Sequence, residues 1–339
     1  MTSLKLNVVD QSPVHGTREP IQAPLDSIEL AKLCDELGYK RYWLAEHHNS
    51  IHFAGPCPEI LIARIAADTK NMRIGSGGVM LSHYSAYKVS EIFRMLETLY
   101  PGRIDLGIGR APGGNQTASA ALAGPHATEH SMQVDHFTDQ AVGLCNYLRR
   151  TMGDDDAFSQ LVQLPDNTPT PELWMLGSGG GSSSLAGTLG MGLAIAHFIA
   201  PAQCTPSIFQ NYEAQFSKVK HEHTPFKMLA IAAVCAETEA DAKLIAGTSA
   251  YRKMMAKQGQ KAPLLSVQEV QDAYKKMNVG QQATFDSYLG YMTVGSPEQC
   301  WDKITNLSKE FSVNEIGVVT VTHSFEHRKE SYRLLGQFL

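Results

Sequence analysis

Two adjacent histidines, His47 and His48, follow a short apolar and aromatic segment at residues 41–45. Consecutive side chains after a strand point in different directions, so one imidazole can face a site while the other anchors the loop. A neutral imidazole can accept or return a proton near neutral pH, which is general acid–base chemistry. The alternative interpretation is a pair of structural histidines whose ring nitrogens are satisfied within the protein.

A glycine-rich segment, GSGGVM at residues 75–80, ends another segment of strand character. Glycine weakens the interior of a strand, so Gly77 and Gly78 indicate either a bulge or bare backbone against which another surface lies. A flat ring system would fit against such backbone. We therefore take Gly77, Gly78 and Met80 as candidate cofactor contacts, with an ordinary bulge as the alternative.

Two further segments have the composition of a phosphate site. Arg110 follows the apolar run 104–109, where its guanidinium can form two parallel hydrogen bonds to a phosphate. The run LGSGGGSSS at residues 176–184 combines bare backbone N–H groups, hydroxyl donors and the predicted start of a helix. Its candidate ligands are Ser178, Gly179, Gly180, Gly181 and Ser182. A flexible, serine-capped turn is the alternative for this run.

Composition and charge exclude several classes of partner. The 339 residues carry 29 basic and 34 acidic side chains, so no broad positive field attracts nucleic acid or anionic lipid. Neither a signal peptide nor a membrane-spanning segment is recognisable, and we expect a cytosolic protein. The six cysteines form no C-x-x-C pair, and the other histidines lack H-E-x-x-H spacing, so neither disulfides nor a metal is expected.

Short apolar segments alternate with longer segments of helical period, which predicts a parallel sheet with crossover helices. A first helix is predicted to open with a capping box at Asp26 and Glu29 and to end at Gly38. Another is predicted at Pro297–Phe311, with Ser296 as its cap. Eight strands are predicted, at residues 4–9, 41–45, 72–79, 104–109, 173–177, 193–196, 228–235 and 316–321.

This pattern predicts an α/β protein with one (β/α)8 barrel, a TIM barrel, formed by residues 1–339 as a single domain. Residues 258–295 are too long for a simple barrel loop, and we interpret them as an inserted helical lid or a mobile loop. Residues 110–127 have no periodicity and are predicted to form a functional or merely tolerated loop. Further helices are predicted at 58–69, 89–99, 128–150, from 182, and at 206–218, 238–257 and 326–338.

Taken together, four motifs resemble the bacterial luciferase-like flavin monooxygenases, in particular their single-chain, alkanal-monooxygenase-like subgroup. The resemblance runs in order over nearly the whole chain. The motifs are RYWLAEHHN at 41–49, GSGGVML at 75–81, YPGRIDLGIGRAPG at 100–113 and VGSPE at 294–298.

The resemblance implies a (β/α)8 barrel that binds reduced FMN, supplied by a separate flavin reductase, and uses dioxygen to oxygenate a small organic substrate. It also implies a homodimer. By position, His47 matches the family's catalytic histidine, the Gly77–Gly78 bond matches a cis peptide beside the flavin ring, and Arg110 matches a phosphate-binding arginine. The residues that match the phosphate loop are Ser178, Gly179 and Ser182.

The chain also departs from the family pattern. Gly109 stands where the large subunit of luciferase has a reactive cysteine, and Ser178 replaces an acidic residue of its phosphate loop. Emission of light is therefore not part of the prediction. A phosphate site after strands four and five also differs from the commoner barrel placement after strands seven and eight.

Three other functions are compatible with these residues. A metal-dependent hydrolase would use His47, His48 and His197 with Glu46, although the first strand lacks the expected H-x-H. An oxidoreductase that uses the deazaflavin F420 would share the same barrel. A flavin-binding protein without catalysis would share it as well, because a fold does not determine chemistry.

Overall fold

Nine strands form one sheet in the computed structural model, which describes residues 4–124, 135–162, 165 and 167–339. The strands are hydrogen-bonded in the order β6-β5-β4-β3-β2-β1-β9-β7-β8, and a further pairing between β6 and β7 closes the sheet into a ring. Every pairing is parallel. The strands are β1 Lys5–Asp10, β2 Arg41–Leu44, β3 Arg73–Met80, β4 Ile104–Gly109, β5 Glu172–Gly177, β6 Gly192–Ala196, β7 Lys227–Cys235, β8 Thr293–Gly295 and β9 Glu315–Val319.

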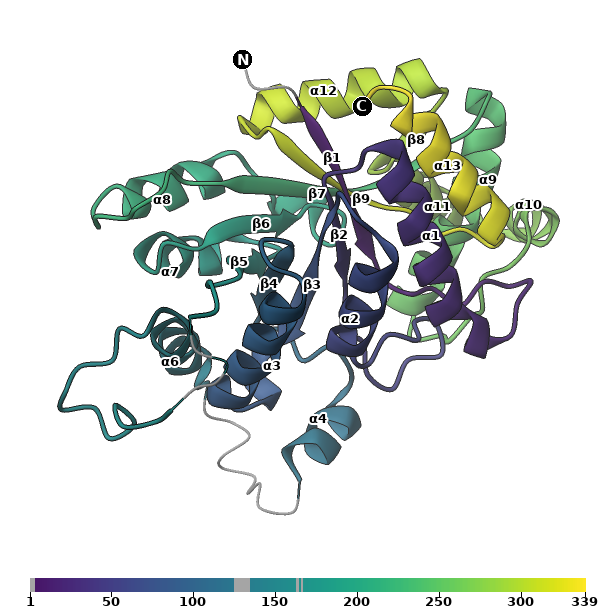
Figure 1. Ribbon diagram of the computed structural model, residues 1–339. Helices are drawn as coiled ribbons and strands as arrows, with labels where there is room; N and C mark the ends of the chain where they lie inside the picture. The colour runs from purple at the N-terminus through teal and green to yellow at the C-terminus, as the bar shows by residue number, and fades with distance from the viewer. Residues whose placement is uncertain (1–3, 125–134, 163–164, 166) are drawn as a thin grey trace.

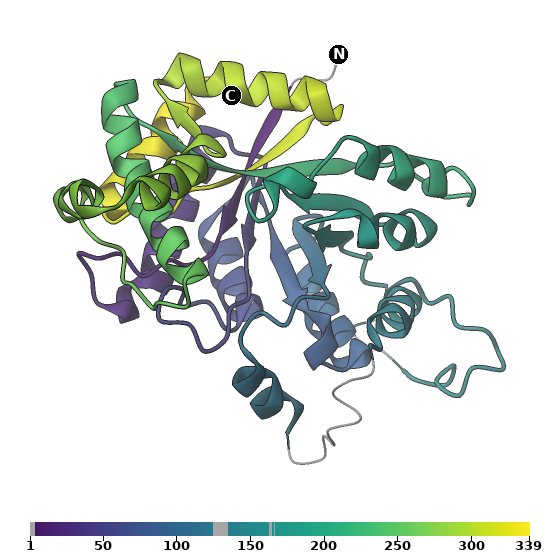
Figure 2. The ribbon, with the colours of Figure 1, turned by 180° about the vertical axis from the view of Figure 1, so that it is seen from behind.

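The ring is the predicted (β/α)8 barrel, and its helices pack around the strands (Figures 1 and 2). Apolar side chains on the outer faces of the strands and the inner faces of the helices form the largest buried cluster, which removes apolar surface from water. The helices are α1 Ala23–Leu37, α2 Pro58–Asp68, α3 Ala86–Leu99, α4 Gln116–Ala123, α6 Phe137–Arg149, α7 Ser183–Thr188, α8 Ser207–Phe216, α9 Glu239–Lys257, α10 Val267–Lys276, α11 Val279–Gly290, α12 Pro297–Phe311 and α13 Phe325–Gly336.

One strand was not predicted. The ring itself consists of eight strands, as predicted, but the three-residue β8 adds a ninth, which pairs with the last residues of β7. Three residues carry too little periodicity to be recognised as a strand. Only the tertiary pairing of Thr293–Gly295 with Ala233–Cys235 identifies it.

The predicted helix ends were partly right. Gly38 ends α1 in the left-handed region, with φ of 90°, and Ser296 caps α12 through a capping box with Gln299. The predicted capping box at Asp26 is wrong, because α1 begins at Ala23 after a short 3-10 turn. Asp26 is instead buried in the first helical turn, where its carboxylate accepts a hydrogen bond of 2.5 Å from Arg18.

The insertion at residues 258–295 is helical and contains α10, α11 and β8. Both helices pack against α9, and Val270, Phe285 and Met254 form a separate buried cluster there. Of the loop predicted at 110–127, residues 116–123 form helix α4. Residues 125–127, and 128–134 of the helix predicted at 128–150, lie outside the described residues.

Buried ion pairs fill the N-terminal end of the barrel. Arg41, at the start of β2, donates to Asp105 at 2.8 Å and to Glu315 at 2.8 Å, and Arg73 donates to Asp105 at 2.6 Å. Asp105 is fully buried. Such charges are tolerated inside a protein only when they are paired, so this end of the barrel is a structural plug.

A second buried pair joins the first strand to the last helix. Arg328 of α13 donates to the Asp10 carboxylate at 2.5 Å, and Tyr42 donates to the same carboxylate at 2.5 Å. Burial alone would raise the pKa of Asp10, but the Arg328 guanidinium holds that pKa below its ordinary value. The pair ties the two ends of the chain together.

Candidate functional site

A cavity of about 600 Å³ opens at the C-terminal end of the barrel strands, opposite the ion-pair plug. All ten residues that the sequence singled out as site residues line it, although they come from four separate segments of the chain. The parallel strands bring these segments together because their C-terminal ends meet at one end of the ring. The ten are His47, Gly77, Gly78, Met80, Arg110, Ser178, Gly179, Gly180, Gly181 and Ser182.

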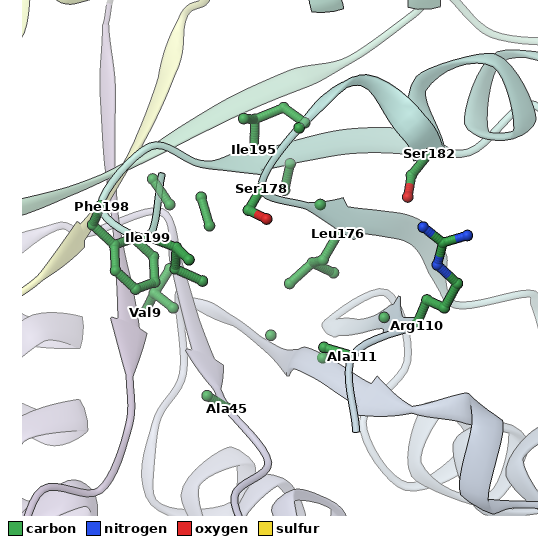
Figure 3. A pocket seen from close by; sticks show the side chains of 18 of the residues that line it. Val9, Ala45, Arg110, Ala111, Leu176, Ser178, Ser182, Ile195, Phe198 and Ile199 are labelled. Atoms are coloured by element: carbon green, nitrogen blue, oxygen red, sulfur yellow. The ribbon is translucent and has the colours of Figure 1, made fainter. Parts of the chain in front are cut away.

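Arg110 and the loop after β5 form one end of this cavity (Figure 3). The two segments lie close together, since a methyl group added to Gly181 would be 3.7 Å from an Arg110 guanidinium nitrogen. The Arg110 side chain is 58% exposed and has one long ion pair, 3.4 Å, with Asp135. Its guanidinium is therefore available to an anion.

The loop after β5 presents backbone and hydroxyl groups to the same end. Residues 180–182 form a 3-10 turn that leads into α7, and the Ser183 hydroxyl donates to the Gly180 carbonyl at 2.7 Å. A methyl group added to Gly179 would contact nothing within 4 Å, so open space adjoins the loop. Helix α7 has only six residues, so the main donors here are the N–H and O–H groups of the loop itself and not the helix terminus.

Bare backbone of β3 forms another wall of the cavity. The Gly77–Gly78 peptide bond is cis, as the resemblance implied, and the pairing of β3 with β4 shifts register between Ser76 and Val79. The segment is therefore a bulge, as the alternative interpretation expected, and it also lines the cavity, while its contact with a cofactor stays a prediction. A methyl group added to Gly78 would lie 2.7 Å from the Gly107 carbonyl oxygen, so no larger residue fits without moving backbone.

The two histidines differ in their position and in their contacts. His48 lies 2.6 Å from Glu46, which is buried and also accepts hydrogen bonds from Tyr84 and from the Met80 backbone. The His48 backbone donates to the Gly113 carbonyl at 2.8 Å, which joins the loops after β2 and β4. His48 thus anchors its loop, whereas His47 lines the cavity.

His47 is nearly enclosed by protein. Its ring packs on Phe53, with 4.6 Å between centroids, and its Nδ1 is buried without a hydrogen-bond partner in the part of the chain that the structure describes. Burial, followed by the positive charge of Arg252, lowers the pKa of His47 to about 4. The imidazole is therefore neutral at pH 7.

The described residues do not support the metal-dependent alternative. Among them, no group of three or more His, Cys, Asp or Glu side chains is arranged to hold a metal ion. His48 is engaged with Glu46, and His197 is not among the residues that line the cavity. The His197 ring instead packs edge-on against Phe311, with 6.1 Å between centroids.

Sequence reasoning missed the apolar walls of the cavity. They are formed by inward-facing strand residues, among them Val9, Leu176, Ala194 and Met228, and by Phe198 after β6 (Figure 3). Nothing distinguishes these residues from core residues in the sequence. Val9 and Leu176 lie near the C-terminal ends of predicted strands, which was the one usable signal, whereas Met228 is the first residue of its predicted strand.

Comparisons with known proteins agree with this geometry. The profile of the luciferase-like monooxygenase family matches residues 4–314. The chain belongs to this family. Both the resemblance seen in the motifs and the predicted barrel are thereby confirmed, and the protein is an enzyme of the monooxygenase class.

Several relatives cover almost the whole chain. An uncharacterised Bacillus subtilis protein, YwcH, is 39% identical over 98% of both chains. The N-acetyl-S-alkylcysteine monooxygenase of the same organism is 31% identical over 98% of this chain and 97% of its own. The crystal structure of apo-MsnO8 is 38% identical, with a TM-score of 0.87 over 99% of this chain and 98% of that one.

More distant structures share the fold alone. The oxygenating constituent of 3,6-diketocamphane monooxygenase from Pseudomonas putida, in complex with FMN, has a TM-score of 0.71 at 18% identity, covering 99% and 98% of the two chains. An F420-dependent secondary alcohol dehydrogenase has a TM-score of 0.67 at 14% identity, covering 100% and 98%. One of these structures is named with FMN and the other with F420, so the shared fold does not select a cofactor.

Proposed function

We propose that this enzyme uses reduced FMN and dioxygen to oxygenate a small organic substrate. The observation that carries the proposal is the convergence on one cavity of a single anion-binding end, a bare-backbone wall and a neutral histidine. One arginine with one donor-rich loop matches a ligand with one phosphate group. FMN has one, whereas FAD and NAD carry a diphosphate.

The residues present fit FMN. In the proposed complex, Arg110 and the loop 178–182 would hold the phosphate, and the backbone of Gly77 and Gly78 would lie along the flavin ring. Met80 would contact the ring beside them. Nδ1 of His47 is buried without a hydrogen-bond partner among the described residues, and a bound ligand would supply one.

The flavin, when bound, would supply the activation of dioxygen, and the protein would supply binding, orientation and proton transfer. His47 would take up or return a proton, because its imidazole is neutral and borders the cavity. The apolar walls would exclude water from the reacting atoms. Anchored by Glu46, His48 would keep the loop of His47 in place.

We infer that reduced FMN comes from a separate flavin reductase. The motif Gly107-Ile108-Gly109 lacks the third glycine and the following helix of a dinucleotide fingerprint, so the chain offers no recognisable site for a nicotinamide donor. The Bacillus subtilis relative named for N-acetyl-S-alkylcysteine acts, by its name, on a small organic molecule. A small organic substrate is proposed for this enzyme as well.

We further infer a homodimer in the cytoplasm. Ile60, Met95 and Leu99 expose apolar side chains on α2 and α3, two adjacent helices that a second copy could cover.

All six cysteines are free, which is usual for a reducing compartment. No helix within the described residues is long and apolar enough to cross a membrane. Light scattering of the purified protein would test the dimer.

Calorimetric titration with FMN, FAD and F420 in both redox states tests the cofactor. FMN should bind more tightly than the other two, and preferential binding of F420 would replace the proposal with the F420-dependent alternative. Mixing the reduced FMN complex with dioxygen and candidate substrates, followed by mass spectrometry, tests catalysis. If no candidate were oxygenated and flavin oxidation matched that of free FMN, the non-catalytic alternative would hold.

A further inference from the structure

Two cations on α9, Arg252 and Lys253, have no acidic partner among the residues that the structure describes. Arg252 is 8% exposed, and its Nε is buried with no hydrogen-bond partner in the described part of the chain. Lys253 makes one long hydrogen bond, 3.4 Å, to the carbonyl oxygen of Phe198. Burial lowers the pKa of Arg252 to about 10 and, together with the nearby Arg252 charge, that of Lys253 to about 8.

An unpaired buried cation is costly, and proteins normally pair such groups. This chain does so elsewhere, since buried Arg328 and Arg41 each contact carboxylates at 2.5 to 2.8 Å. Arg252 has no counterpart of this kind among residues 4–124, 135–162, 165 and 167–339, and no carboxylate acts on its pKa. The missing partner therefore points to an anion that binds from outside the chain.

The position of these cations connects them to His47. Phe53 contacts both His47 and Arg252. The centroid of its ring is 4.6 Å from that of the His47 ring and 5.0 Å from the Arg252 guanidinium carbon. Arg252 lowers the pKa of His47 by its charge, which also places the two side chains near each other. Lys253 contacts Phe198, a residue of the cavity wall that lies across the cavity from Arg110 (Figure 3).

We propose that Arg252, supported by Lys253, forms a subsite for a carboxylate group of the substrate. Arg110 and the loop 178–182 line one end of the cavity, whereas Arg252 lies outside the cavity lining, against Phe53 on the side of His47. A guanidinium fork matches the two oxygens of a carboxylate. The substrate class is then a small organic acid, bound by its carboxylate at Arg252 with its apolar part toward His47.

This assignment names the substrate class of the proposed monooxygenase and in that respect rests on the proposed function. Its test uses binding rather than turnover, so that the two can fail separately. The probes are hexanoate and its uncharged analogue hexanamide, titrated into the flavin-free and the FMN-loaded protein and followed by ligand-observed NMR. If FMN failed to bind, the flavin-free titrations would still decide the subsite.

Hexanoate should bind at least about tenfold more tightly than hexanamide, the usual scale for a hydrogen bond to a charged group. Arg252→Gln should abolish this preference while FMN affinity stays within about twofold of the wild type. Lys257→Gln, which removes an exposed charge from the same helix, is the matched control and should change neither. Arg252→Lys keeps the charge without the fork and should retain part of the preference.

Thermal unfolding separates a binding role from a structural one. Because Arg252 is unpaired in the ligand-free protein, Arg252→Gln should not lower the melting temperature, whereas loss of a structural arginine would. Equal binding of hexanoate and hexanamide, absence of hexanoate binding, or a preference that survives in Arg252→Gln would each overturn the subsite. A lowered melting temperature with unchanged hexanoate affinity would show that Arg252 is structural.

Discussion

Replacement of Arg110 by alanine should weaken FMN binding without destabilising the barrel. The side chain is 58% exposed, and its one ion pair spans 3.4 Å between groups that are both more than half exposed. Exposed pairs of this kind contribute about 0–1 kcal/mol, so the free energy of unfolding should change by less than about 1 kcal/mol. The structural cost of the substitution is therefore small.

The expected loss of FMN affinity follows from the charge-assisted contact with phosphate. Such contacts contribute about 1.5–3 kcal/mol, and the exposure of Arg110 places it near the lower limit, which corresponds to about a tenfold increase in Kd. Calorimetric titration of the wild type and of Arg110→Ala with FMN would measure this change. Thermal unfolding of the same two proteins would give the effect on stability.

Riboflavin, which lacks the phosphate, is the control ligand. Its affinity should be the same for the wild type and for Arg110→Ala, because the substitution removes only the phosphate contact. The difference between FMN and riboflavin should also shrink as salt concentration rises. An equal loss for both flavins, or an unchanged Kd for FMN together with a lower melting temperature, would refute the phosphate-binding role.

Three more predictions concern the cavity walls and the buried ion pair. His47→Ala should keep FMN affinity, slow the oxygenation step by about 10²–10⁴-fold, and lower the product formed per flavin oxidised, with hydrogen peroxide released instead. His48→Ala should mainly cost stability, and normal turnover by His47→Ala with inactive His48→Ala would reverse the two roles. Gly78→Ala should lower the free energy of unfolding by about 1–3 kcal/mol, since its methyl group would lie 2.7 Å from a backbone oxygen; an unchanged melting temperature would contradict this. Asp10→Asn should destabilise the protein by about 3–5 kcal/mol in urea unfolding at pH 7, because Arg328 would lose its charged partner.

The pH dependence of that last effect has a definite sign. The pKa of Asp10 is lowered in the folded protein, so the stabilisation it provides is fully present above its unfolded pKa, near 3.8. This stabilisation is lost as pH falls through the lower, folded pKa. The difference between the wild type and Asp10→Asn should therefore be constant at neutral pH and shrink in strong acid, which urea unfolding across that range would reveal.

Local features of the fold were predictable because they depend on neighbouring residues. Strand Ile104–Gly109 was predicted at its observed ends, as was helix Pro297–Phe311 with its Ser296 cap. Apolar periodicity and capping act within a few residues, so a sequence window contains them. The start of α1 was misplaced because Asp26 resembles a capping residue in the sequence. Only the structure shows that Asp26 is buried and paired with Arg18.

The sequence by itself determined the barrel, the order of its elements and the ten candidate residues at its C-terminal end, since parallel strands bring consecutive strand ends together. Only the tertiary structure showed that His48 is bound by Glu46, while His47, which the family resemblance had already singled out, lines the cavity. It alone placed Arg252 against Phe53, with no counter-ion among the residues that the structure describes. Burial and pairing of a charge depend on residues far apart in the chain, and no local pattern records them.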